Sequence, residues 1–189
     1  MKKVYLILFL VSYFINAQEV FEEPSFVGEA FIIKTDNTIL NLEKEQIKLK
    51  TKAGLSVYLA GIGKLKTKID VPGCCSGASF NPDNEIKLIV RAVDNETDPI
   101  SIIQIFKFEK KKKKRLAELA SWGTFTGLSS NNLNNLSFEA KKYGEKSYML
   151  TITNFERGAE YGIIVNNINA SNQELIMVST FSVQGDPSL

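Results

Sequence analysis

Apolar residues alternate with polar ones along most of this chain, and a period of two is the pattern of a half-buried β-strand. Within residues 64–71, for example, Leu65, Ile69 and Val71 alternate with lysines and an aspartate. Residues 100–108 are partly apolar on both faces, which predicts a central strand. No segment after the first seventeen residues has a convincing helical stripe, and we favour a strand even for residues 112–120. Similar alternating rows occur at residues 46–50, 86–92, 147–152, 161–165 and 175–183.

Turns rich in asparagine separate the predicted strands. Residues 35–38 have the composition of a hairpin turn, and residues 94–99 form a polar loop. Many short strands with such turns predict an all-β fold: an antiparallel β-sandwich, Ig-like or jelly-roll-like, with eight or nine strands. Tyr161 opens a strand just after a turn, as in the tyrosine corner of Greek-key sandwiches, where the hydroxyl bonds back across the turn. A tyrosine at a strand start is otherwise simply a good β-former.

The first residues have the composition of an export signal. Lys2 and Lys3 precede an apolar run at residues 4–14, and Ala17 supplies a small residue for cleavage. This run favours a cleaved signal helix over an anchor, because a membrane span needs about 20 residues. We therefore predict a signal peptide at residues 1–17 and one domain at residues 18–189. We expect the mature domain to be exported to the periplasm, the cell surface or the medium, with no stable membrane span.

Removing the signal changes the charge balance. The chain has 23 Lys and Arg against 21 Asp and Glu, and the signal takes away Lys2 and Lys3 but no acid. The mature chain is therefore neutral, which gives no support to general binding of nucleic acid or membrane through net charge.

The chain contains no histidine. This excludes Ser-His-Asp and Cys-His nucleophile activation, His-ligated zinc and the usual neutral-pH general base. Two cysteines alone cannot build a structural zinc site, and no glycine-rich loop has phosphate-binding spacing. We expect no cofactor and no enzymatic activity. Only a carboxylate-dependent hydrolase stays open, because glycosidases need just two acids.

The two cysteines, Cys74 and Cys75, are adjacent. Normal disulfide geometry places Cα atoms about 4.4–6.8 Å apart, farther than neighbouring residues lie. We favour two small residues in a turn, reduced or capped. A vicinal disulfide acting as a rigid knuckle is the alternative, and the oxidising compartment also permits an intermolecular disulfide.

One polar loop is the best candidate for a metal ion. Asp94, Glu96 and Asp98 supply hard oxygen ligands of the kind that Ca²⁺ prefers. The loop lacks the spacing and central glycine of a helical calcium loop, and aspartates also bond their own backbone in turns. We therefore expect the structural role and predict no metal site.

Six consecutive cations form the candidate anion patch. A buried strand cannot accept lysines on both faces, so we expect an exposed turn or edge. Edge lysines block pairing between sheets, which is the leading interpretation. The functional alternative is binding to acidic lipid headgroups, polysaccharide or peptidoglycan, whereas nucleic acid is the weakest partner in this compartment. The residues are Lys110, Lys111, Lys112, Lys113, Lys114 and Arg115.

These observations favour a non-catalytic envelope or secreted binding module whose partner is an unknown envelope protein or polysaccharide. A carbohydrate-binding module is the runner-up, because the single Trp122 can form a sugar-stacking platform. A tryptophan between small residues is more often part of a sandwich core. Exposed, coplanar aromatics are needed for sugar binding, so burial of Trp122, Tyr58 and Tyr143 would count against it.

Several phrases in the second half of the chain are similar to those of other sequences. Residues 90–95 (VRAVDN), 106–109 (FKFE), 138–144 (FEAKKYG) and 160–163 (EYGI) occur in an order that resembles a group of uncharacterised exported bacterial β-sandwich proteins. The group has no assigned activity. The resemblance implies a shared domain and transfers no site residues.

Overall fold

The computed structural model describes residues 21–48, 50–53, 64–123, 129–131, 134–166 and 175–185. The predicted signal peptide and Tyr58 lie outside these residues, and so does the side chain of Trp122. The one described helix is α2 (Pro99–Ile102). The strands are β1 (Ala30–Ile33), β2 (Ile39–Asn41), β3 (Glu43–Lys48), β4 (Lys50–Ala53), β5 (Lys64–Pro72), β6 (Ser79–Phe80), β7 (Ile86–Arg91), β8 (Ile103–Lys107), β9 (Glu109–Lys111), β10 (Lys114–Gly123), β11 (Ser129–Asn131), β12 (Glu139–Tyr143), β13 (Ser147–Ile152), β14 (Glu160–Val165) and β15 (Leu175–Val183).

The strands form three sheets, which we call A, B and C. Sheet A has the order β12-β13-β7-β1-β2, and sheet B has the order β3-β15-β14-β8, with β6 beside β15. Sheet C has the order β11-β10-β5-β4, and β9 pairs with β10. Strand β6 pairs with β15 in parallel, whereas neighbouring strands elsewhere in the three sheets are antiparallel. The prediction of an all-β, antiparallel fold is therefore confirmed.

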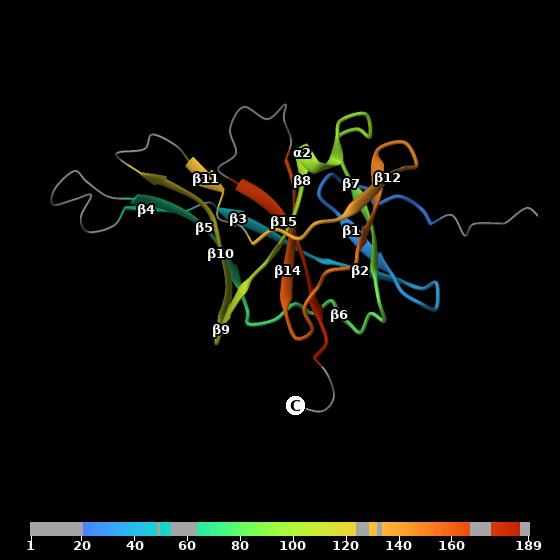
Figure 1. Ribbon diagram of the computed structural model, residues 1–189, viewed down its shortest axis with the longest axis horizontal. Coiled ribbons are helices and arrows are strands. Elements are labelled where there is room, and N and C mark those ends of the chain that lie inside the picture. The colour runs from blue at the N-terminus through green and yellow to red at the C-terminus, as the bar shows by residue number, and fades with distance from the viewer. Residues whose placement is uncertain are drawn as a thin grey trace, which may run out of the picture.

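Sheet B is the middle layer, with sheet A on one side and sheet C on the other (Figure 1). Side chains of a strand alternate between its faces, so neighbouring residues of sheet B enter different cores. Ile163 of β14 packs into the core shared with sheet A, and Ile164 into the core shared with sheet C. Ile105 and Phe106 of β8 divide in the same way. This double burial explains why residues 103–108 are apolar on both faces.

The structure corrects three details of the predicted strands. Residues 100–102 belong to α2 rather than to a strand, because Asp98 caps the helix by accepting a bond from the Ile100 amide and Pro99 opens it. Strand β8 lies in the central layer but at one end of the order of sheet B. There the Leu136 amide donates to the Ile105 carbonyl over 2.7 Å. The described strands also outnumber the predicted eight or nine, because β2, β6, β9 and β11 have only two or three residues, too few to show the alternating pattern.

Gly162 makes room for two aromatic rings on the face of sheet B that is turned toward sheet C. A Cβ at this position of β14 would lie 2.7 Å from the ring of Phe106 and 2.8 Å from that of Phe108. Those two rings meet edge to face with centroids 5.0 Å apart. Only a residue without a side chain fits against this pair.

The predicted turns direct the chain as expected. In the β1–β2 hairpin, Asn37 has a positive φ of 59°, and the Asp36 carboxylate accepts bonds from the Thr38 amide and hydroxyl. Among the described residues, no helix is long and apolar enough to cross a membrane.

Candidate functional site

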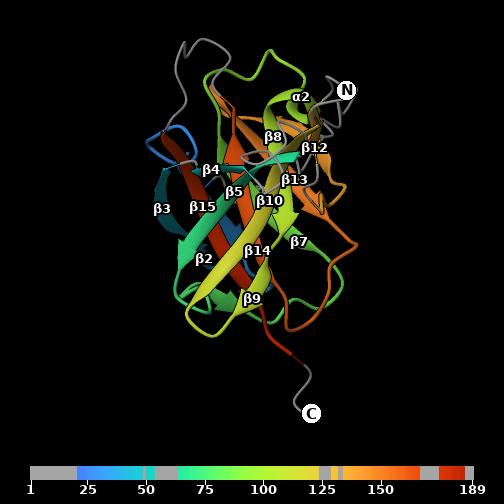
Figure 2. The same ribbon diagram turned by 90° about the vertical axis from the view of Figure 1, so that its left-hand side faces the viewer.

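Five lysines gather at the end of a β-hairpin, which we call the lysine tip (Lys110–Lys114). Strand β9 pairs antiparallel with β10, with Lys111 opposite Lys114, so Lys112 and Lys113 form the connecting turn. Figure 2 shows this hairpin projecting at the lower end of sheet C, and the view from below shows cations gathered on that side. Lys110, Lys111, Lys112 and Lys113 are exposed and Lys114 is half-buried. The expectation of an exposed turn or edge is confirmed for Lys110, Lys111, Lys112 and Lys113, whereas Lys114 is half-buried in β10.

Arg115 does not belong to this surface, and its inclusion in the anion patch is wrong. Its side chain is 1% exposed. Its Nη1 donates to the Thr180 hydroxyl over 2.9 Å, and its Nη2 donates to the Pro72 carbonyl over 3.1 Å. The reason is the alternation along β10, which puts Arg115 and the buried Ala117 on the face toward sheet B.

A polar cluster surrounds the buried guanidinium where sheets B and C meet. Arg115 Nη1 lies 3.8 Å from Glu160 Oε2, and its Nη2 lies 3.4 Å from Glu43 Oε2. Burial raises the pKa of Glu160, which is 2% exposed. Burial would also raise the pKa of Glu43, but hydrogen bonds from Ser76 and Thr180 and the charge of Arg115 lower it overall. The guanidinium of Arg115 therefore lies between two carboxylates, one with a raised pKa and one with a lowered pKa.

The loop between β5 and β6 closes over this cluster and carries both cysteines. Cys74 and Cys75 are joined as a vicinal disulfide, with Cα atoms 3.8 Å apart, and both residues are exposed. The favoured reduced state is therefore not the one observed. On one side the Gly73 amide donates to the carbonyl of Lys113 over 3.0 Å. On the other side the Ser76 amide donates to Glu160 over 2.8 Å, and the Ser76 hydroxyl donates to the Thr180 carbonyl over 3.0 Å. The disulfide thus lies between the lysine tip and the buried cluster.

In the loop proposed for calcium, the carboxylates bond to the backbone and side chains of the protein itself. Asp94 accepts bonds from the amides of Glu96 and Thr97, and these bonds lower its pKa. Asp98 caps α2, and Glu96 pairs with Lys142 over 2.8 Å. Within the described ranges, no group of three His, Cys, Asp or Glu side chains could hold a metal ion. The structure does not bring the three acids together as a site.

The N-terminal segment of the described chain forms a strap across sheet A, at residues 21–25. The Glu23 carboxylate accepts bonds from the Ser147 hydroxyl at 2.5 Å and the Lys146 amide at 3.0 Å, and it pairs with Arg91 at 2.9 Å. Burial would raise the pKa of Glu23, but these bonds and the bond from the Glu145 amide lower it to about 2. Tyr143 secures the strap by donating to the Phe21 carbonyl over 2.6 Å.

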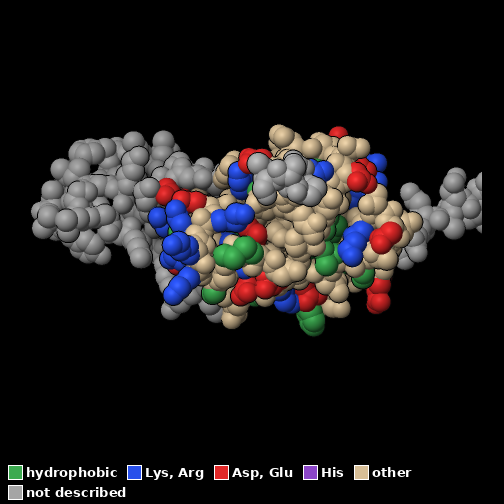
Figure 3. Space-filling model, turned by 90° about the horizontal axis from the view of Figure 1, so that it is seen from below, with side chains coloured by type: hydrophobic (Ala, Val, Ile, Leu, Met, Phe, Trp, Pro, Cys, Tyr) green, Lys and Arg blue, Asp and Glu red, His purple; other side chains and the backbone are tan. Residues whose placement is uncertain are grey.

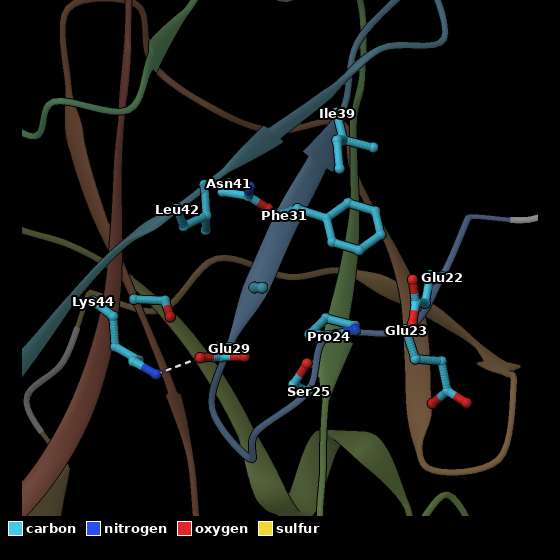
Figure 4. A pocket seen from close by; sticks show the side chains of 12 residues that line it. Glu22, Glu23, Pro24, Ser25, Glu29, Phe31, Ile39, Asn41, Leu42 and Lys44 are labelled. Atoms are coloured by element: carbon cyan, nitrogen blue, oxygen red, sulfur yellow. Dashed lines mark hydrogen bonds and ion pairs between the residues drawn. The ribbon is translucent and has the colours of Figure 1, made fainter.

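A hollow of about 460 Å³ lies between the strap and strands β1 and β2 (Figure 4). Phe31 and Ile39 line it together with Glu22, Glu29 and Lys44. Lys44 forms an ion pair with Glu29, and Glu23 pairs with Arg91, so two of the three glutamates that line the hollow already have cationic partners. The wall of the hollow is therefore mixed, with both apolar and acidic side chains.

The Tyr161 hydroxyl reaches back across the turn before β14. It accepts a bond from the Glu156 amide over 2.7 Å, and its ring stacks on Phe181 with centroids 5.2 Å apart. This is the arrangement of a tyrosine corner.

No family model matches the chain. No curated protein matches it either.

Sequence reasoning missed the polar cluster and the Glu23 anchor. One signal was available for the cluster, since Arg115 falls in register with Ala117 on the inward row of β10. Nothing local marks Glu23, because its partners at Arg91 and residues 145–147 are distant along the chain.

Proposed function

We propose that the mature protein is an exported, non-catalytic binding module that contacts an anionic component of the cell envelope through the lysine tip. The carrying observation is the projection of five consecutive lysines from the end of sheet C. A local patch suits a chain whose mature part is neutral, because the attraction is confined to the surface that the tip presents.

The lysines of the tip differ in whether their ammonium groups already bond to other groups of the protein. Lys111 pairs with Glu109, Lys114 pairs with Asp70 over 2.9 Å, and Lys110 donates to the Gly158 carbonyl over 2.6 Å. Within the described part of the chain, no ion pair engages the ammonium groups of Lys112 and Lys113. These two cations at the turn are therefore the best placed to meet an external anion.

The test compares the double variant Lys112→Ser/Lys113→Ser with Lys141→Ser/Lys146→Ser, which removes two exposed lysines from the β12–β13 hairpin of sheet A. Binding is measured to phosphatidylglycerol vesicles and, separately, to dextran sulfate, so lipid and polysaccharide sources of anionic groups are distinguished. A lysine near an anionic surface contributes about 1 kcal/mol, so we expect the tip variant to bind about 10- to 30-fold more weakly. The attraction also weakens as salt shortens the screening length.

Two results decide the proposal. Weaker binding by the tip variant alone supports it. Equal binding by both variants and the unmodified chain contradicts it, and leaves the lysines only their role in blocking sheet pairing.

The alternatives gain less support. A carbohydrate-binding module needs several exposed aromatics, but among the described aromatic side chains only Phe26 is exposed, at 67%, and Lys44 lies 5.4 Å from its ring centroid. Tyr143 is half-buried and bonded to the strap. A carboxylate hydrolase needs two free acids that face each other, but in the hollow Glu23 is held by Ser147 and Arg91, and Glu29 pairs with Lys44.

We also infer that sheets A and B form an Ig-like rather than a jelly-roll-like unit. The support is the bond between Tyr161 and Glu156, since a tyrosine corner is a feature of Ig-like sandwiches.

A further inference from the structure

We propose that Cys74–Cys75 is a thiol–disulfide exchange site that accepts two electrons from an exported dithiol. This inference goes beyond the binding function and does not depend on it. It rests on three observations: the exposure of the disulfide, the anchoring of its loop on both sides, and the lysines beside it.

Exposure makes the sulfurs reachable. Both cysteines are exposed at the surface of the β5–β6 loop. Thiol–disulfide exchange requires a thiolate to approach one sulfur directly, so access is its first condition. A disulfide that served only as a core staple would instead be buried.

Hydrogen bonds on both sides of the two cysteines hold the disulfide at the surface. The Gly73 amide is bonded to Lys113 of the hairpin turn, and the Ser76 amide to the buried Glu160. Glu160 is itself held beside Arg115. The two residues that flank the cysteines are therefore fixed to different layers of the sandwich, and the loop keeps its place when the disulfide opens.

The lysine tip places positive charge beside the disulfide. Because Gly73 bonds to the backbone of Lys113, the cysteines lie next to the hairpin turn. Cations near a disulfide attract the incoming thiolate and stabilise the thiolate that leaves. Asp70, the acid nearest in sequence, already pairs with Lys114. Glu43 and Glu160 face Arg115.

The reaction balances without a cofactor. One thiolate of the dithiol attacks a cysteine sulfur, the bond between Cys74 and Cys75 breaks, and the departing sulfur takes a proton from water. The second thiol of the dithiol loses its proton and attacks the mixed disulfide, releasing the oxidised substrate and the second cysteine thiol. The substrate loses two electrons and the protein gains them.

The test uses the mature, oxidised chain and measures its reduction by two monothiols of opposite charge, glutathione and cysteamine, and by dithiothreitol. Alkylation with iodoacetamide followed by mass spectrometry counts the released thiols. We expect dithiothreitol to release two alkylatable cysteines in the folded protein. We expect Lys112→Ser/Lys113→Ser to slow the anionic glutathione by about 3- to 10-fold at low ionic strength, where salt does not screen the lysines. Cysteamine should be slowed less, because its ammonium group offsets the attraction of its thiolate to the lysines.

The controls separate this proposal from the binding function. Lys141→Ser/Lys146→Ser should leave both rates unchanged, and Cys74→Ser/Cys75→Ser should remove the released thiols. Resistance of the folded chain to dithiothreitol, with reduction only after unfolding in guanidinium, would overturn the proposal. Equal slowing of glutathione and cysteamine by the tip variant would also overturn the role of the lysines. Neither result depends on whether the tip binds vesicles or dextran sulfate.

Discussion

Arg115 Nη1 of β10 lies 3.8 Å from Glu160 Oε2 of β14, and the two side chains are only 1% and 3% exposed. The pair joins sheet C to the middle sheet directly beneath the disulfide loop. Isolated buried charges are costly, so each of these groups depends on the other and on the hydroxyls and amides around them. Within the described chain the Nε of Arg115 has no hydrogen-bond partner, so the pairing is made through the two terminal nitrogens.

Replacing Arg115 should therefore be strongly destabilising. Arg115→Met keeps much of the volume but leaves Glu160 buried without its cation, and we expect the free energy of unfolding to fall by about 3–5 kcal/mol. Urea denaturation measures this, with Lys113→Ser as a surface control that should change stability by less than about 0.5 kcal/mol. The double variant Arg115→Met/Glu160→Leu should recover much of the loss, because no unpaired charge remains. Equal stability of Arg115→Met and Lys113→Ser would refute the role of the pair.

Glu23 should make stability depend on pH in the acid range. Its folded-state pKa of about 2 lies below the ordinary value of 4.5, so its carboxylate stabilises the fold above about pH 4.5. This stabilisation is lost as the pH falls toward 2. Glu23→Gln should cost about 1–2 kcal/mol at neutral pH, and the difference from the unmodified chain should shrink below pH 4.5. Urea denaturation at a series of pH values tests this, with the exposed Glu22→Gln as control. A difference that stays constant across the series would argue against the Glu23 anchor.

Gly162→Ala should disturb the core between sheets B and C. The added methyl would meet Phe106 at 2.7 Å and Phe108 at 2.8 Å, which is closer than carbon atoms pack. Overpacking of this kind costs about 1–3 kcal/mol, which thermal or urea denaturation would detect. Gly77→Ala is the matched control, because a Cβ there would have no atom within 4 Å. Similar stabilities for the two variants would show that the two rings can move aside freely.

Tyr161→Phe tests the turn before β14. The change removes only the hydroxyl that accepts the Glu156 amide, and we expect a loss of about 1 kcal/mol. Hydrogen exchange gives a local readout, since the Glu156 amide should exchange faster while amides of sheet C keep their rates. Unchanged exchange at Glu156 would mean that the hydroxyl does not protect this turn.

Local pattern predicted the strands because period-two alternation is a property of neighbouring residues. It placed β5, β7, β13 and β14 and the β1–β2 turn, and it predicted that the lysine run would form an exposed turn or edge. It misplaced residues 100–102, where the capping by Asp98 and the ring of Pro99 outweigh the apolar run. It also underestimated the number of strands, because strands of two or three residues such as β2, β6 and β9 are too short to show an alternation.

The sequence by itself determined that this chain is β-rich, that its lysine run must leave the core, and that histidine chemistry is absent. Only the tertiary structure decided that a third sheet covers sheet B, that Arg115 turns inward while its five lysine neighbours do not, and that Glu23 secures the strap. The physical reason is that each of these depends on partners far away along the chain, such as Thr180 and Glu160 for Arg115 and Ser147 for Glu23. Burial and charge pairing are set by which strands meet, and that is a property of the whole fold.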